Sequence, residues 1–461
     1  MEPVSTIVAF LASFAPAITA PTMENLGVLL RGALLARGPR TVTACLVAAC
    51  PWVTKHWSAY DNVFRRARLC MLALARILFG LVLRRVPSEA EILLAIDESL
   101  VRRYGPWVVG VGMHRDSVRS SKGRNQVTPG HKWVTVSVVV KLPFMERPVA
   151  LPILSVLYTA SKPAKRNRQK PLHRQHRTVP ELALLMVRWI VRWAPQRRFR
   201  VVGDGAYGTH DLADAFNRAS RVPGLRRVTL VSRFKFDGAT FAPPPSYSGR
   251  GRPRIKGEKL PSPAAVAADP ATLWERVTVA WYGATRKEVF VCSRTGLWYR
   301  KGSGATPVRW LVVRDPEGKR RDEVFFTTEM DLMVRAIVEI FVCRWSIETA
   351  FQEARALLGL ETLRNRTEEA VRRSVPMLLG LYSFIVIWFA EHVTAPEACK
   401  RHTPWYEKPS VTFSDMFAAA REDVLGERLS ARSGTKTDES KVVAWLLNLA
   451  NSRFTPIKRR A

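Results

Sequence analysis

Three acidic residues stand at positions from which their carboxylates could act together. Asp97 closes the apolar run "EILLAID", Asp204 follows an apolar run in "VVGDGAYG", and Glu348 lies in a later segment. A lone carboxylate at the end of a buried strand is costly unless it is paired. Two such strands in one sheet would place their acids side by side, where each repels the other unless a cation lies between them.

Carboxylate oxygens of this kind favour Mg²⁺ or Mn²⁺. Two such ions about 4 Å apart would clamp the attacking and leaving oxygens of an in-line phosphodiester displacement. One ion would lower the pKa of the attacking water or 3′-hydroxyl, and the other would stabilise the leaving oxygen. The alternative is that Asp97 and Asp204 each cap the turn that follows a strand, with no catalytic role.

The segment that carries Glu348 (341–359) predicts a helix, because Ala and Leu are abundant and Pro is absent. Arg344, Glu348 and Arg355 lie on one face of that helix, at separations of four and seven residues. This polar stripe is either a solvated surface or faces a site that needs a carboxylate. The opposite face is apolar and is expected to pack on the sheet; it holds Val342, Ile347, Ala350, Ala354, Leu357 and Leu358.

The elements that must position these residues form a mixed α/β pattern. Runs of β-branched residues predict strands at 91–97, 107–115, 133–143, 198–208 and 226–234, and helical patterns predict helices at 179–195 and 210–219. This order favours a mixed sheet with helices covering it. Residues 89–235 and 326–395 are interpreted as the two parts of one catalytic core.

Three further regions flank or interrupt that core. Residues 1–88 contain ten Lys and Arg against three acids and predict a helical N-terminal domain that binds DNA ends, with a plain solvated helical bundle as the alternative. Residues 236–325 predict a β-rich insertion domain, and 396–461 predict a tail for dimerisation or DNA contact. The apolar stretch 375–390 is interpreted as a buried helix, because it is short for a membrane span.

The overall charge points to a polyanionic partner. Of 461 residues, 72 are Lys or Arg and 39 are Asp or Glu, which gives a net charge of +33. Nucleic acid is the commonest partner of such a field, with a ribosomal or membrane-surface protein as the alternative. Six scattered cysteines without a CxxC pair argue against a zinc site or a disulfide framework and favour reduced thiols in a cytosolic protein. Residues 4–21 are apolar but make a poor signal peptide, since no Lys or Arg precedes them.

Basic loops supply candidates for DNA contact. Residues 161–177 hold seven Lys and Arg and no acid, as a phosphate-tracking loop would, although a solvated loop has the same composition. The stretch 248–257 contains the Arg-Gly-Arg-Pro core of minor-groove peptides, with a non-specific basic loop as the alternative. Together with the turn 117–134, these loops predict DNA contacts by Lys122, Arg124, Lys165, Arg166, Arg168, Lys170, Arg250, Arg252 and Arg254.

The acidic blocks resemble those of DDE transposases of bacterial insertion sequences, in the insertion sequence 4-like group. The matching blocks are "AIDESLVRRYG", "VVGDGAYG" and "CRWSIETAFQEARALLG", and the resemblance covers about residues 25 to 392. That family's third block is Tyr, two residues, Arg, three residues, Glu, six residues, Lys. Arg344 and Glu348 keep this spacing, whereas Phe341 replaces the Tyr and Arg355 the Lys. Phe341 lacks the hydroxyl that could bond to the DNA backbone.

This resemblance implies an RNase H-like core that is interrupted by a β-rich insertion and preceded by a helical domain. It implies that Asp97, Asp204 and Glu348 are the catalytic and metal-binding residues and hold two Mg²⁺ (or Mn²⁺) ions. Arg344 and Arg355 would hold phosphate. An aromatic residue of the insertion would stack on a flipped base, for which Trp298 is the candidate, with core packing as the alternative.

The activity so implied is cut-and-paste transposition: strand hydrolysis, hairpin formation and strand transfer into target DNA. The partners would be double-stranded DNA, as terminal inverted repeats and target, and a second copy of the chain in a homodimer. The location would be the cytoplasm of a bacterium, at its nucleoid, with no membrane involved. The alternatives are a catalytically silent DNA-binding protein derived from a transposase and a structure-specific nuclease of the same fold.

Overall fold

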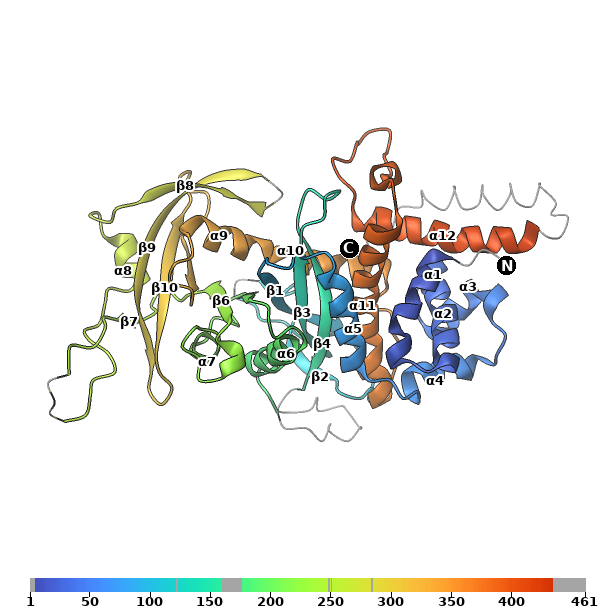
Figure 1. Cartoon of the computed structure of the whole chain (residues 1–461), viewed down its shortest axis with the longest axis horizontal. Helices are drawn as coiled ribbons and strands as arrows, with labels where there is room; N and C mark the ends of the chain where they lie inside the picture. Colours follow the sequence, from blue (N-terminus) through green and yellow to red (C-terminus); the bar gives the residue numbers. More distant parts are fainter. Residues whose placement is uncertain are drawn as a thin grey trace.

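A mixed sheet forms the centre of the protein (Figure 1). The computed structural model describes residues 5–121, 123–159, 176–247, 249, 251–282 and 285–433. Within these residues one sheet of 11 strands runs from the predicted catalytic core into the segment after residue 235. Helices lie against this sheet, and a group of N-terminal helices lies at the opposite end of the molecule from the strands of the insertion (Figure 1).

Five strands of the sheet have the RNase H-like arrangement. Three form an antiparallel meander and two continue it in parallel, because β1 pairs antiparallel with β3 and parallel with β5. Further pairs join β3 to β4 in antiparallel and β5 to β6 in parallel orientation. The strands are β1 (Ile92–Arg102), β3 (Val127–Val140), β4 (Val149–Tyr158), β5 (Phe199–Gly203) and β6 (Val228–Arg233). The predicted fold class is confirmed.

The third strand of the meander was not among the predicted strands. The predicted strand 107–115 is reduced to the short β2 (Gly112–Arg115), and Gly110 before it has a φ of 77°. The meander is completed instead by β4, whose Pro152 has no N–H for the ladder. The register between β3 and β4 shifts next to Pro152, so a bulge accommodates the proline.

Strands of the predicted insertion continue the same sheet. β11 (Glu323–Thr327) pairs with β6, and β10 (Gly304–Arg314) pairs with β11. Next come β9 (Arg286–Arg300), β7 (Thr240–Phe241) and β8 (Glu275–Ala280), with the short α8 (Pro263–Ala268) nearby. The ladder is therefore unbroken from the parallel strands of the core to the tip of the insertion.

Helices pack on the core strands. α6 (Val179–Trp193) packs on β3 and β4, and α7 (His210–Ala215) packs on β6. α5 (Met71–Leu83) and α11 (Glu368–His392) pack on β4 and lie between the sheet and the N-terminal helices (Figure 1). Among the described residues, α11 is the one helix long and apolar enough to cross a bilayer, and 67% of its apolar window is buried in protein.

The N-terminal helices form a second, smaller core. This core is built by α2 (Ala20–Leu35), α3 (Val42–Ala48) and α4 (Trp57–Arg65), with the 3₁₀ helix η1 (Leu11–Ala17) packed against it. The buried side chains of α1 (Thr6–Phe10) belong to the main core instead. The long α12 (Phe413–Ser433) runs beside the N-terminal helices, where Glu427 accepts two hydrogen bonds from Arg31. Asp423 accepts the backbone N–H groups of Thr6 and Ile7, so α12 also covers the start of α1.

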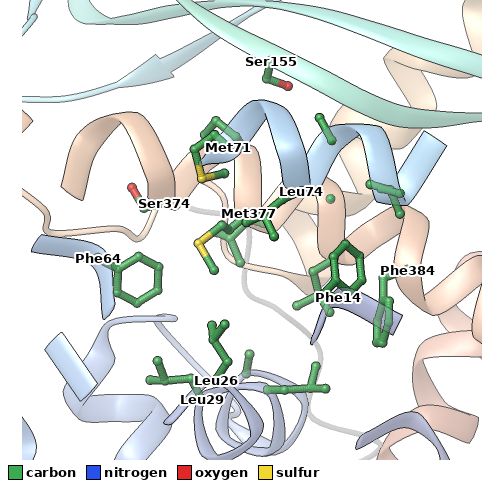
Figure 2. Close-up of a pocket in the computed structure, with 18 of the residues that line it drawn as sticks. Phe14, Leu26, Leu29, Phe64, Met71, Leu74, Ser155, Ser374, Met377 and Phe384 are labelled. Carbon is green, nitrogen blue, oxygen red and sulfur yellow. The ribbon is translucent and has the colours of Figure 1, made fainter. Parts of the chain in front are cut away.

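A cavity of about 200 Å³ separates the two cores. Figure 2 shows Leu26 and Leu29 of α2 across the cavity from Leu74 of α5, with Phe384 of α11 at its side. Its walls are almost wholly apolar side chains. The N-terminal helices therefore contact the catalytic core through an interface with a void in it, unlike the densely packed sheet.

Candidate active site

Asp97 lies within a strand and not at its end. It is the sixth of the eleven residues of β1, so the prediction that a strand closes at Asp97 is wrong. The strand continues because its next residues still pair with β3. Its parallel pairing with β5 does stop here, since the last pair is Ile96 with Gly203. Asp97 and Asp204 thus follow directly after one pair of residues on adjacent strands, at the same level of the sheet.

A tight loop fixes Asp204. Its Oδ1 accepts the backbone N–H of Ala206 at 2.9 Å, and the Ser232 hydroxyl donates to its carbonyl oxygen at 2.7 Å. The chain then folds back over the strand end, where a Cβ on Gly203 would lie 2.7 Å from that of Tyr207. This crowding requires glycine at position 203 and holds the Asp204 carboxylate at the end of β5.

Glu348 comes from the first turn of α10 (Trp345–Leu357). The predicted single helix over 341–359 is two helices, because α9 (Val334–Cys343) ends one residue before Arg344. Arg344 sits at this junction, and only 8% of its side chain is exposed. Its Nη1 donates to Glu348 Oε1 at 2.7 Å and to Asp97 Oδ2 at 3.1 Å. One guanidinium therefore joins the carboxylates of β1 and α10.

The back of α10 is apolar, as predicted. Ile347, Ala350 and Ala354 are fully buried, and the helix packs on β1 and β4. Phe341, at the end of α9, is also fully buried, and its ring stacks on that of Phe325 with centroids 4.2 Å apart. These contacts hold the helix against the sheet so that its polar stripe faces Asp97.

The electrostatics of the site are unbalanced. Burial raises the pKa of Asp97 to about 8, against the opposing effect of Arg344 and with additions from Asp204, Glu98 and Glu348. Burial also raises the pKa of Asp204. A single guanidinium thus does not offset the carboxylates that converge here, and an added cation would favour their ionised forms.

The donor set has the right chemistry for a hard divalent cation, since it consists of carboxylate oxygens. In the part of the chain that the structure describes, however, no three His, Cys, Asp or Glu side chains are arranged closely enough to enclose an ion. The Arg344 guanidinium lies between Asp97 and Glu348 and takes the place that a shared cation would occupy.

The other predicted phosphate ligand is bonded within the protein. Arg355 donates to the Ser99 hydroxyl, and its Nε lies 3.3 Å from Glu361 Oε1. Ser99 is two residues after Asp97 on β1, so Arg355 contacts the same strand farther along. Its role toward DNA stays a prediction.

The remaining predicted DNA contacts lie in several environments. Arg124, Arg252 and Arg254 are exposed. Trp298 is half-buried, with its ring edge-to-face with those of His210, Phe234 and Phe326 at centroid distances of 5.1–5.4 Å. Its part in base stacking stays a prediction. The predicted contacts that lie outside the described residues are Lys122, Lys165, Arg166, Arg168, Lys170 and Arg250.

Several polar residues beside the carboxylates escaped the sequence reasoning. Glu98 accepts hydrogen bonds from Tyr207 at 2.9 Å and from Lys132 at 2.8 Å, directly behind Asp97. Arg233 at the end of β6 forms an ion pair with Glu323, at 2.5 Å. The "DE" doublet at 97–98 and the position of Arg233 at the end of a neighbouring parallel strand were available signals.

A hollow of about 480 Å³, lined by charged and apolar side chains, opens beside Arg233. Trp281 and Arg320 line it, and the Arg320 guanidinium lies 5.7 Å from the centroid of the Trp281 ring. Arg233 in turn lies over the ring of Phe341, one helix turn before Arg344. The predicted insertion thus contributes cationic and aromatic groups next to Arg233.

The chain is similar to a cryo-EM structure of a piggyBac transposase synaptic complex with hairpin DNA, with 10% sequence identity, a TM-score of 0.41, and coverage of 96% of this chain and 77% of that chain. No curated protein sequence matches the chain. The model of a family described as DDE superfamily endonuclease matches residues 13–288, which include Asp97 and Asp204 but not Glu348. The chain therefore belongs to the DDE superfamily endonuclease family.

Proposed function

We propose that this chain is a DNA transposase that cuts and joins DNA with Asp97, Asp204 and Glu348. The observation that carries the proposal is the Arg344 guanidinium, which bonds to Asp97 and Glu348 while Asp204 lies at the adjacent strand end. Membership of the DDE endonuclease family and the net charge of +33 support DNA as the substrate.

The proposed cofactor is Mg²⁺ or Mn²⁺, as two ions. Endonucleases of this superfamily generally depend on divalent metal ions. Asp97 and Asp204 would hold the metal with Glu348, and a cation there would favour the ionised form of Asp97, whose pKa is raised by burial. When bound, the metal supplies activation of the attacking hydroxyl and stabilisation of the leaving oxygen. Arg344, relieved of neutralising Asp97, would bind a phosphate oxygen of the scissile strand.

The rest of the proposal concerns the DNA and the assembly. Residues 1–88 would bind the terminal inverted repeats, and residues 236–325 would hold DNA beside the catalytic core. The reaction would proceed by strand hydrolysis, a hairpin intermediate and strand transfer, in a homodimer that pairs two ends. We further propose that the chain belongs to the insertion sequence 4-like group and acts at a bacterial nucleoid.

Metal-dependent cleavage tests this function directly. We expect nicking of an end-containing duplex with Mn²⁺, and its loss in Asp97→Ala with DNA binding retained. The matched control is Asp237→Ala, because Asp237 is an exposed acid on a loop. DNA binding without cutting under any divalent metal would favour the silent DNA-binding protein. Cutting of branched DNA without end sequences or joining would favour the nuclease.

The DNA around the reading frame gives an independent test. A transposase gene of this kind lies between inverted repeats that are bordered by a short direct duplication of the target. Such repeats would also supply the end sequences for the cleavage assay. A frame without inverted repeats on either side would contradict a role in moving its own element.

A further inference from the structure

The segment from Arg344 onward follows β1 along one side of the strand. Three contacts join this segment to β1 and to Arg103, the residue that follows the strand. The contacts occur in the same order along both segments, so the two segments lie side by side. We refer to this pair of segments as the seam, made of residues 97–103 and 344–366. In order, the contacts are Asp97 with Arg344, Ser99 with Arg355, and Arg103 with the carbonyl of Asn365.

The far end of the seam holds a buried cation. Arg103 follows the last residue of β1, and only 7% of it is exposed. Its guanidinium donates to the Asn365 carbonyl, while Arg364 and Arg366 on either side of that residue are exposed. Burial, followed by the charges of these two arginines, lowers the pKa of Arg103 to about 10. Arg103, Arg364 and Arg366 therefore bring three positive charges together, and the charge of Arg103 is already removed from solvent.

No described acidic side chain forms an ion pair with these three arginines. The nearest acids along the chain are committed elsewhere: Glu361 is paired with Arg102 and Arg355. Glu368, on the other side, is paired with Arg372. A buried cation among like charges is costly unless an anion joins it.

The backbone holds the cluster in place and adds to its positive potential. The N–H of Val109 donates to the carbonyl of Arg366 at 3.0 Å, which fixes the 364–366 segment against the loop after β1. The Thr367 hydroxyl is buried and has no partner within the described structure. It stands at the start of the 25-residue α11, whose N-terminus carries a partial positive charge.

We infer that Arg103, Arg364 and Arg366 form a binding site for a backbone phosphate of duplex DNA. This inference rests on the proposed function for the identity of the anion. The site lies on the same seam as the carboxylates, six residues along the chain from Asp97, or about 20 Å at 3.3 Å per residue. That span corresponds to about six base pairs of duplex. Arg364 and Arg366 would contact the phosphate from solvent, and Arg103 would hold their segment and add its charge from beneath.

Salt dependence of binding tests the site without any catalysis. The probe is a fluorescent duplex of about 30 base pairs, titrated in EDTA at several salt concentrations. The variant is Arg364→Gln with Arg366→Gln, both at exposed positions. The matched control is Arg188→Gln with Arg192→Gln, which removes the same charge from the exposed side of α6.

Each phosphate contact contributes about 0.9 to the slope of log K against log salt. We expect the slope to fall by about 1 in the Arg364/Arg366 variant and to stay unchanged in the control. Equal slopes for the two variants would overturn the site. So would protection of the wild-type fold by inorganic phosphate with no change in the DNA slope, since the cluster would then bind a free anion only.

A positional test separates this inference from the proposed function. Neutral methylphosphonates are placed singly along an end-containing duplex. One at about six base pairs from the cut should weaken binding of the wild type but not of the Arg364/Arg366 variant. If the protein never cuts, the proposed function fails while the salt slope still decides the phosphate site. If it cuts but no methylphosphonate has a variant-dependent effect, the phosphate site fails alone.

Discussion

The two ends of the seam carry opposite charge imbalances. At one end Asp97, Asp204 and Glu348 converge on a single guanidinium, and the pKa of Asp97 rises to about 8. At the other end Arg103 lies between Arg364 and Arg366, and its pKa falls to about 10. Both groups are pushed toward their neutral forms by burial and like charge. The difference in sign fits our two proposals, in which an ion from outside the chain completes each end: a metal ion at the first and a phosphate at the second.

Such charge imbalances destabilise the folded state, so we interpret their presence as a sign of function. A structural ion pair would have been matched within the protein, as Arg102 and Asp116 are, at 2.8 Å. Strongly shifted groups with specific charged neighbours are concentrated at functional sites. The seam places two such groups on one strand and its extension, so a duplex that reaches the carboxylates would also pass the arginines.

The largest effect is expected at the acidic end. Glu348→Gln removes a carboxylate but keeps its shape, and we expect cleavage to fall at least about a thousandfold with DNA binding retained. Single-turnover nicking in Mn²⁺ measures this. Gln352→Ala, at an exposed position one turn along the same helix, should cut normally. Normal cutting by Glu348→Gln would remove α10 from the active site.

The second-largest effect is expected on stability, when Arg344 is removed from its position between Asp97 and Glu348. Arg344→Gln leaves Asp97 and Glu348 without their shared hydrogen-bond donor, and we expect the metal-free protein to lose about 1–3 kcal/mol of stability. Mn²⁺ should then stabilise this variant more than it stabilises the wild type, because the ion no longer competes with a guanidinium. Thermal melts with and without Mn²⁺ measure both changes. An equal or smaller metal effect in Arg344→Gln would contradict the competition.

The pH dependence of stability should follow from Asp97. Its pKa is about 8 in the folded, metal-free protein and near 3.8 in the unfolded chain. Between these values the folded state keeps a proton that the unfolded state has released, so stability falls as pH rises from about 4 to 8. Burial raises the pKa of Glu353 to about 7, which adds a decline of the same sign.

The comparison of wild type with Asp97→Asn isolates the contribution of Asp97, because Glu353 is present in both. Melting temperatures in EDTA across this pH range should decline less steeply in the variant. Parallel curves would show that Asp97 is ionised throughout and that the acidic end is balanced without a metal.

The smallest effect is expected at the basic end without DNA. Arg364→Gln relieves repulsion of the buried Arg103, and we expect a gain of a few tenths of a kcal/mol in the free protein. The same variant should bind duplex more weakly. Denaturant unfolding and anisotropy measure the two changes. Loss of stability together with unchanged binding would mean that Arg364 is an ordinary structural side chain.

The acidic end of the seam could be predicted from the sequence more fully than its basic end. Asp97 and Asp204 were found because apolar strand runs make a lone acid conspicuous. The place of Asp97 within β1 was missed, since pairing with β3 beyond the acid leaves no mark in the local pattern. β4 was missed because Pro152 disrupts a strand pattern, and only the bulge seen in the structure resolves the conflict.

The arginine cluster could not be read from the sequence at all. Arg103 and Arg364 are separated by 261 residues, and each lies in a basic stretch that resembles many others in a chain of charge +33. What distinguishes Arg103 is its burial, which only packing reveals. The inward bonds of Arg355 to Ser99 and Glu361 were hidden for the same reason.

The unbroken ladder from β6 to β11 has a mechanical consequence. Because Phe325 pairs with Arg233, the predicted insertion is joined to the core strands by backbone hydrogen bonds and not only through the covalent chain. It cannot rotate as a hinged domain unless those hydrogen bonds break. A force that bound DNA exerts on its outer strands would therefore be transmitted through the sheet as a change in its twist. It would reach β6, which pairs directly with β5, the strand that ends one residue before Asp204.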